Sequence, residues 1–393
     1  MKLGYVHTDR EEQNKVMKVL KMISEPVALD ELGIGRIRDA FADKMFPGIS
    51  TLQKRMKYFA LLPQLYNIAA REQYSFPDEV RPVVRKLEIA MTKKLIDGNA
   101  EHTGITGINA YNRDKKTFND NKFVKYDPAY IYNSGLLKYD ILKDRRYDVA
   151  IFNFSKRTDE GGLPCEQPDV VELDLDNETP LGLELTKSDA DFIIRQIKKT
   201  CSGSLLYKLI ECATEDDSFE LPKNFEDVSK DGLPCDLQQL LDCAQRFANF
   251  IYIVHVRYNY VYSRESNPSV PDKELEDEFI KLYEKYKKDC SDIKKDINDI
   301  LSVVHSEIRE PKCIEFCEAV ATLFATDELN TNALDELIKN REKSVKPGRY
   351  KIGNKPYSED RRVHYHKLTY RWEVVRKFVE ELRKGVKNGG KVK

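Results

Sequence analysis

The chain has 393 residues, of which 33% are charged and 41% hydrophobic, and its formal net charge is −1. This length can form one large domain or two to three ordinary domains with a sizeable core. No apolar run approaches the roughly 20 residues that span a bilayer, and Met1–Tyr5 lacks the charged and then apolar pattern of a signal peptide. We therefore expect no contact with a membrane and a cytoplasmic location.

The residue types that hold metals and cofactors are scattered. Eight cysteines occur without a Cys-x-x-Cys pair, and we expect them to be reduced and partly buried. His364 and His366 have no carboxylate or cysteine at the spacing of a metal site. The sequence also contains no Walker loop, no dinucleotide fingerprint and no Ser-His-Asp arrangement. We therefore expect neither a metal nor an organic cofactor.

The first elements are predicted to be helices. Asp9–Ser24 has the pattern of an amphipathic helix. A second helix is predicted from the stripe of Ile34, Ile37, Phe41 and Met45, which recur at helical spacing. The opposite face of this helix carries one cation and two carboxylates, Arg36, Asp39 and Asp43. Such a row is a salt-bridged surface if it meets solvent, and a catalytic or ligand-holding row if it lines a cleft.

A turn at Phe46-Pro47-Gly48 is predicted to join this helix to the next. Ser50 is expected to cap the second helix, with Leu52, Met56, Phe59 and Leu62 on its apolar stripe and Lys54 and Lys57 facing away. Pro63 should kink or stop it, because proline lacks an N–H group. The resulting hairpin would bring seven polar side chains within one or two turns of one another: Arg36, Asp39, Asp43, Ser50, Gln53, Arg55 and Tyr58.

The middle of the chain changes character. Pro77–Ile96 is predicted to be a helix, and Asp127-Pro128 is expected to start a shorter one. The helical pattern then breaks over residues 142–187, where Asp148–Phe154 alternates like a strand. Residues 158–189 contain 10 acidic residues and one lysine. We interpret residues 142–187 as an acidic linker or insertion.

Helices are predicted again from Ser188 onward, and two of them are long enough for a long-helix bundle. Their expected ranges are Asp189–Thr200, Leu205–Thr214, Asp236–Tyr262, Asp272–Ile308 and Pro311–Ala325.

The end of the chain is basic. Residues 341–393 contain 17 Lys or Arg against 6 Asp or Glu, with aromatic residues between them. Basic side chains release counterions from phosphates, and interleaved rings can stack on bases. This pattern favours contact with nucleic acid, and the candidate residues are Arg349, Arg361, Arg362, Lys367 and Arg371.

These patterns predict a mainly α fold, a multi-helix bundle with a small irregular or β-containing insertion. We expect four segments. They are an N-terminal helical catalytic domain (1–141), the acidic insertion (142–187), a helical bundle (188–338) and a basic, aromatic segment that packs on the bundle and contacts DNA (339–393).

The stretch LGIGRIRDAFADKMFPGISTLQKR resembles the signature of an uncharacterised bacterial family of unknown function. Similar landmarks follow in the same order at Ser188-Asp189-Ala190, Gly203–Leu206, Arg257-Tyr258-Asn259 and Leu368–Trp372. Such proteins resemble components of phage-defence loci, and some resemble DNA glycosylases that remove glucosylated hydroxymethylcytosine from phage DNA. The resemblance therefore implies an enzyme that needs no cofactor, acts on double-stranded phage DNA, and has other defence proteins as possible partners.

A glycosylase must flip its nucleotide, grip the base and stabilise positive charge as the glycosidic bond breaks. We expect Asp39 or Asp43 to be the general base, with Arg36 orienting Asp39. The expected substrate contacts are Arg38 and Arg55 to phosphates, Ser50 and Gln53 to base or sugar, and Tyr58 by stacking. Two alternatives remain, a non-catalytic DNA-binding adaptor of a defence system and a metal-dependent nuclease that uses the same carboxylates.

Overall fold

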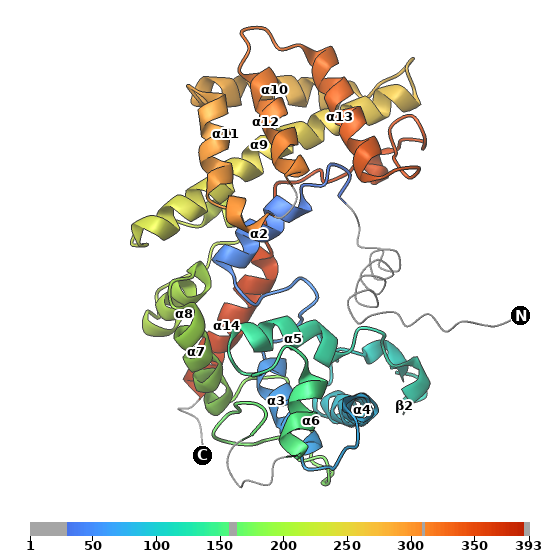
Figure 1. The fold of residues 1–393 in the computed structure, drawn as a ribbon, viewed down its shortest axis with the longest axis vertical. Coiled ribbons are helices and arrows are strands. Elements are labelled where there is room, and N and C mark those ends of the chain that lie inside the picture. Colours follow the sequence, from blue (N-terminus) through green and yellow to red (C-terminus); the bar gives the residue numbers. More distant parts are fainter. Residues whose placement is uncertain (1–29, 157–162, 309–310, 389–393) are drawn as a thin grey trace, which may run out of the picture. The chain divides into compact units, whose positions relative to one another are not determined.

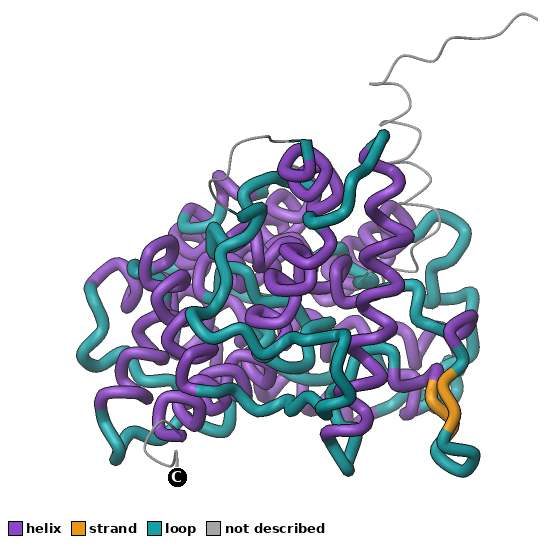
Figure 2. The backbone as a smooth tube through the Cα atoms, turned by 90° about the horizontal axis from the view of Figure 1, so that it is seen from below, coloured by secondary structure: helices purple, strands orange, loops and turns teal. Residues whose placement is uncertain are grey.

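The computed structural model describes residues 30–156, 163–308 and 311–388. Helices make up most of this part of the chain, and one two-stranded sheet accompanies them (Figures 1 and 2). The predicted mainly α fold is therefore confirmed. The helix predicted at Asp9–Ser24 lies outside the described residues.

The described chain forms two compact units, and each combines segments that are far apart in the sequence. Unit 1 takes the chain up to Arg38 together with Asn249–Lys367, and unit 2 takes Asp39–Ala248 together with the chain from Leu368. The boundaries fall inside two helices, α2 (Gly35–Met45) and α9 (Cys235–Ser266). This division follows three-dimensional packing, whereas the four segments predicted from sequence follow chain order.

Besides its parts of α2 and α9, unit 2 contains helices α3 to α8, α14, four 3₁₀ turns and a hairpin. Their bounds are η1 (Pro77–Glu79), α3 (Tyr58–Ala69), α4 (Val80–Gly98), η2 (Ile108–Ala110), β1 (Tyr111–Asn112), β2 (Thr117–Phe118), η3 (Asp120–Lys122), α5 (Pro128–Lys138), α6 (Tyr147–Ser155), α7 (Lys187–Cys201), α8 (Leu205–Glu215), η4 (Phe225–Asp227) and α14 (Trp372–Asn388).

Helix α3 lies at the centre of unit 2, where α4, α5, α6 and α7 pack against it (Figure 1). Every side chain of α3 except Ile68 is buried. Pro63 lies inside this helix and does not stop it, so one of its two predicted effects is wrong, and the predicted kink stays a prediction. A proline in a helix interior costs about 3 kcal/mol. Burial of apolar side chains on all faces of α3 offsets that cost.

The segment between α2 and α3 is not helical, so the predicted cap at Ser50 is wrong. Its backbone N–H groups bond to side chains elsewhere in unit 2. Tyr132 Oη accepts from Lys54 N at 3.0 Å and from Arg55 N at 3.1 Å, and Glu381 Oε2 accepts from Met56 N at 2.7 Å. Leu52, expected on the buried stripe, is exposed. These tertiary partners replace the bonds that a helix would make.

The turn before this segment agrees with the prediction. Ile49 N donates to Phe46 O, and Gly48 has a φ of 81°. A Cβ atom at Gly48 would lie 2.8 Å from the Tyr139 ring, so a side chain has no room there. The stripe of Ile34, Ile37, Phe41 and Met45 on α2 is buried, as predicted.

Residues 142–187 differ from their prediction in the first part and agree with it in the second. Asp148–Phe154 lies in α6 rather than in a strand, because a short apolar run fits a buried helix as well as a strand. The described residues from 163 to 186 are an irregular segment with buried Leu173, Leu183 and Leu185. The hairpin of β1 and β2 lies earlier in the chain, outside the predicted insertion.

Lys57 is a further correction, because it is buried rather than facing away. Its ammonium group forms ion pairs with Glu172 of the irregular segment and with Asp189 of α7. Asp189 also forms a capping box with Thr186 at the N-terminus of α7. The Asp189 carboxylate therefore caps this helix and pairs with the buried Lys57 ammonium group.

The last helix, α14, packs against α7 and α8 (Figure 1). Val375, Phe378, Val379 and Leu382 form its buried stripe. Gly385 permits a close approach, because a Cβ atom there would lie 2.8 Å from the Ala190 Cβ and 2.9 Å from the Leu185 Cβ. Helix α14 is thus held closely against α7 and the segment before it.

Unit 1 is also helical. Besides its parts of α2 and α9 it contains α10 (Lys273–Asp289), α11 (Ile293–Ser302), η5 (His305–Glu307), α12 (Lys312–Phe324), α13 (Thr331–Val345) and η6 (Glu359–Arg361). The single helix predicted over Asp272–Ile308 is therefore wrong. It breaks after Asp289, and Asp292 accepts a hydrogen bond from Lys295 N to start α11. The predicted helix placed Asp292 in its interior. In the structure Asp292 is the N-cap of α11, a position that aspartate favours.

Candidate functional site

The predicted catalytic aspartates lie on the outer face of α2. The side chain of Asp39 is 47% exposed and that of Asp43 is 65% exposed. Arg371 holds both carboxylates, with Nη1 at 2.6 Å from Asp43 Oδ1 and Nη2 at 3.4 Å from Asp39 Oδ1. The same Nη1 donates to Ile49 O at 2.6 Å. The structure thus joins two predicted catalytic residues to a predicted DNA contact, in an arrangement that we call the Arg371 clamp.

The backbone around Arg371 explains its position. Tyr370 and Arg371 have φ angles of 48° and 68°, in the left-handed region that non-glycine residues rarely adopt. Buried neighbours hold this conformation. Tyr370 Oη donates to Ala244 O at 2.7 Å, its ring packs on Phe41, and Trp372 Nε1 donates to Pro222 O at 3.1 Å. Packing on both sides therefore turns the Arg371 side chain toward α2.

Arg36, the third member of the predicted catalytic row, has different surroundings in unit 1. It lines a hollow of about 240 Å³ with Gly33, Lys312, Cys313, Arg341, Ser344 and Val345. Arg341 Nε donates to Leu32 O at 2.8 Å, which fixes one wall of this hollow. Three of the lining residues are basic, so the hollow suits an anion better than a cation.

Two of the predicted substrate contacts bond to the protein's own backbone. Gln53 is buried, its Nε2 donates to Gly48 O, and its Oε1 accepts from Ser50 N. Tyr58 is buried against Tyr132, its Oη accepts from Thr106 N, and burial raises the pKa of its phenol to about 12. In this conformation Gln53 and Tyr58 support the fold around the segment. Ser50 and Arg38 are half-buried.

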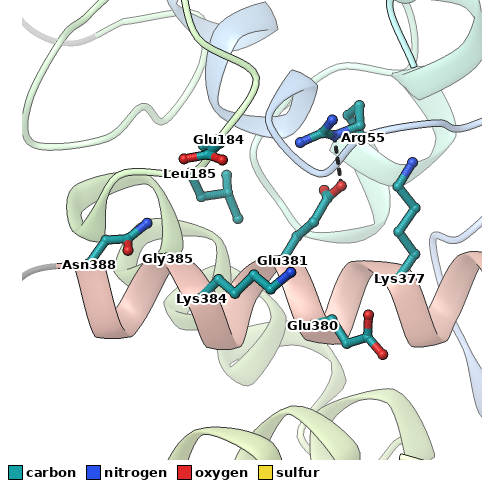
Figure 3. Close-up of a pocket in the computed structure, with 9 residues that line it drawn as sticks. All are labelled: Arg55, Glu184, Leu185, Lys377, Glu380, Glu381, Lys384, Gly385 and Asn388. Carbon is teal, nitrogen blue, oxygen red and sulfur yellow. Dashed lines mark ion pairs between the residues drawn. The ribbon is translucent and has the colours of Figure 1, made fainter. Parts of the chain in front are cut away.

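Arg55, predicted to hold a phosphate, lies at a second hollow of about 300 Å³, which we call the α14 hollow (Figure 3). The residues that line it are Arg55, Glu184, Leu185, Lys377, Glu380, Glu381, Lys384, Gly385 and Asn388. Arg55 Nε lies 2.7 Å from Glu381 Oε1, and Arg55 Nη2 donates to Leu183 O at 3.2 Å. Only 13% of the Glu381 side chain is exposed.

Burial shifts the proton affinities of two side chains in the α14 hollow. It raises the pKa of the Glu381 carboxyl, against the opposing effects of the Met56 N–H group and of Arg55, Lys377 and Lys384. Burial also lowers the pKa of the Lys377 ammonium, which the nearby cations Arg55 and Lys54 lower further. The two shifts bring the pKa of the carboxyl and the pKa of the ammonium closer together, and such perturbed pairs are candidates for proton transfer.

Sequence reasoning missed Lys377 and Glu381. Lys377, Glu381, Lys384 and Asn388 follow one another at steps of four, three and four, so they share one face of α14. This row of charges resembles an ordinary solvated helix face. The spacing of these residues does not show that Arg55 and Leu185 lie against this face of α14.

The predicted DNA contacts divide into two groups. Arg349, Arg361 and Lys367 are exposed. Arg362 pairs with Asp272 at 2.8 Å and donates to Tyr357 Oη at 3.1 Å, and Arg371 belongs to the clamp. Arg362 and Arg371 must leave carboxylate partners to bind phosphates, whereas Arg349 and Arg361 have exposed side chains in the basic segment.

Comparison with known proteins was informative for the first third of the chain. Residues 1–130 match the model of a family of unknown function (DUF6361), which covers a third of the chain and includes α2, α3 and Arg55. No curated protein and no solved structure matches the chain. In the described part of the chain no helix is long and apolar enough to cross a membrane. The match supports the expected resemblance to an uncharacterised domain, and it does not extend to Lys377 or Glu381.

Proposed function

We propose that this chain is a DNA glycosylase of antiviral defence, which flips a glucosylated hydroxymethylcytosine out of viral DNA and excises it to leave an abasic site. The observation that carries the proposal is the α14 hollow, where three basic side chains line the same space as three carboxyl groups, among them the largely covered Glu381. Its volume of about 300 Å³ lies at the lower end of the range for small-molecule sites, which suits one extruded base. The resemblance of the signature stretch supplies the class of reaction.

The residues of the α14 hollow divide the work by their chemistry. Arg55 and Lys384 provide cations for the phosphates beside the flipped nucleotide. Glu381 provides the proton that the departing base takes up. The C1′–N1 bond breaks, its electron pair goes to the base, and water adds to C1′ to give the sugar hydroxyl.

A carboxylate must also accept a proton from the attacking water. Asp39 and Asp43 remain our sequence-based candidates for this general base. They belong to the Arg371 clamp and do not line the α14 hollow, so this role requires the nucleotide to reach the clamp. Glu381 is the stronger candidate for the acid, because its carboxyl is buried while the two aspartates are exposed and paired with Arg371.

A direct assay tests the proposal. The full chain is incubated with duplexes that contain cytosine, hydroxymethylcytosine or glucosylated hydroxymethylcytosine, with and without EDTA, and the products are probed for alkali-labile abasic sites. We expect base release from the glucosylated duplex in both conditions. Strand cleavage that requires metal would support the nuclease instead, and binding without release would support the adaptor. The Arg371 clamp favours the adaptor as the second candidate, because a salt-bridged helix surface suits a protein interface.

Exposed cations of the basic segment should contribute to affinity for DNA without reading sequence. We expect Arg349→Ala and Arg361→Ala together to weaken binding to modified and unmodified duplexes alike. The slope of log affinity against log salt should fall by about one for each phosphate that the variant no longer neutralises. Titrations over a range of salt concentrations measure this slope. Lys294→Ala, which removes a lysine from α11, is the matched control.

An unchanged salt slope in the double variant would remove Arg349 and Arg361 from the DNA interface. Weaker binding confined to the glucosylated duplex would instead assign them to recognition of the modification.

A further inference from the structure

Unit 1 contains a compact group of metal-ligating atoms that comes from segments far apart in the sequence. Asp30 and Glu31 precede α2, and His364 follows η6. One ligand atom from each of these three residues lies within 4.8 Å of the other two. Asp30 and Glu31 are buried and His364 is half-buried.

The distances within this group suit a small divalent ion. His364 Nε2 lies 3.4 Å from Glu31 Oε2 and 3.7 Å from Asp30 Oδ1. A tetrahedral ion with bonds of about 2.0–2.2 Å holds its ligand atoms about 3.3–3.6 Å apart. The distances from the imidazole nitrogen to the two carboxylate oxygens are therefore close to those that such an ion would impose, and the two oxygens lie within 4.8 Å of each other.

A second and independent feature is the histidine packed against this group. His255 of α9 is 2% exposed, and both of its ring nitrogens lack a hydrogen-bond partner among the described residues. Its ring centroid lies 5.1 Å from that of His364. Buried polar atoms in proteins are nearly always bonded, so a histidine with neither nitrogen satisfied indicates a missing partner. A metal ion is a partner that imidazole nitrogens bind well.

The lysines that pair with Glu31 use only one of its two carboxylate oxygens. Lys346 and Lys351 contact Glu31 through its other oxygen, Oε1, at 2.8 and 3.0 Å. Asp30 Oδ1 also accepts from Leu32 N at 3.1 Å, which orients this carboxylate. The lysines thus compensate part of the negative charge at Oε1, and Oε2 faces His364.

We propose that Asp30, Glu31 and His364 bind a divalent transition-metal ion of the zinc type beside the buried ring of His255, which ties the start of α2 to the segment after η6. The site is structural, and it is independent of base excision in the α14 hollow. It revises the expectation of no metal. Spacing in the sequence could not show this site, because Asp30 and Glu31 lie more than 300 residues before His364.

Zinc binding to the full chain tests this proposal. The purified protein is treated with EDTA, dialysed, and titrated with Zn²⁺ in a calorimeter, with Mg²⁺ as the comparison ion. We expect one Zn²⁺ per chain and a rise in Tm on addition of Zn²⁺. Mg²⁺ should bind much more weakly, because it favours all-oxygen sites that keep several waters.

Variants locate the site. His364→Ala and Asp30→Asn should each lower the affinity for Zn²⁺ by at least about 10-fold. His305→Ala, which removes an exposed histidine of η5, should leave it unchanged. Circular dichroism shows whether each variant is folded. Co²⁺ bound to the unaltered chain gives a further readout, since visible bands of tetrahedral intensity report nitrogen and oxygen ligands without any mutation.

The proposal is overturned if the unaltered chain binds no Zn²⁺ after EDTA treatment, or if the folded His364→Ala and Asp30→Asn variants bind it as tightly. Co²⁺ bands that are the same in His364→Ala as in the unaltered chain would also overturn it, because the ion would then be bound elsewhere.

Discussion

Two parts of unit 2 pair an arginine with acidic side chains, and they differ in their access to water. In the Arg371 clamp, Asp39 and Asp43 are largely exposed, and solvent screens their attraction to the guanidinium group. In the α14 hollow, Glu381 is mostly covered and binds Arg55 and the Met56 N–H group. Burial shifts proton affinity at Glu381. Similar residue types thus form exposed ion pairs in one place and a carboxyl group with a raised pKa in the other.

The largest effects are expected when the carboxyl groups of Glu381, Asp39 and Asp43 are replaced one at a time by amides. We expect Glu381→Gln to lower the rate of base release by at least about 100-fold, because the buried proton donor is removed. Binding to DNA should persist. Asp39→Asn and Asp43→Asn should leave binding roughly intact, and at least one should abolish turnover if the general base lies there. Single-turnover rates on the glucosylated duplex measure all three.

Glu373→Gln is the matched control for these variants, since it removes an exposed carboxyl group from the same helix as Glu381. Full activity in Glu381→Gln would show that the α14 hollow is not the site of reaction. Full activity in both aspartate variants would leave the clamp with a structural role only.

A smaller effect is expected from opening the clamp itself. Arg371→Ala removes two ion pairs and the bond to Ile49 O, and it should lower the free energy of unfolding by roughly 1–2 kcal/mol. Urea unfolding measures the change. High salt should reduce the difference from the unaltered chain, because the two aspartates are exposed.

Arg371→Ala could instead leave the free energy of unfolding unchanged and reduce the salt dependence of DNA binding. That result would make Arg371 a phosphate contact, as its sequence surroundings predict.

The smallest effect concerns pH. Because the pKa of Glu381 is raised above 4.5, the folded chain binds more protons than the unfolded chain between 4.5 and the raised value. The associated stability is present below pH 4.5 and is lost as the pH rises through the folded pKa. Glu381→Gln should therefore lose less stability over this range.

Glu88 contributes in the same direction, since burial raises its pKa well above the usual value. Comparing unfolding curves of Glu381→Gln, Glu88→Gln and the unaltered chain at several pH values separates the two groups. Identical pH dependence in Glu381→Gln and the unaltered chain would contradict a raised pKa at Glu381.

Much of the helical fold could be read from apolar spacing. The stripe of α2, the turn at Gly48 and the bounds of α7 and α8 follow from local pattern, which the structure confirms. The errors occur where distant residues decide local structure. Tyr132 and Glu381 bind the backbone N–H groups after Ser50, and surrounding helices keep Pro63 inside α3. No window of sequence contains those partners.

The candidate sites show the same limit. The sequence picked out Asp39, Asp43 and Arg55, and it placed Arg371 in a different role. It could not bring Arg55 to Glu381, or Asp30 to His364, because each pair meets only through tertiary packing.

The bond between Met56 N and Glu381 joins positions 325 residues apart. A nascent chain therefore carries Arg55 for most of its synthesis without the helix that faces it. Premature termination anywhere before α14 yields a polypeptide with no α14 hollow, however well its earlier helices have formed. Under the proposed function, base excision would begin only after α14 has been synthesised.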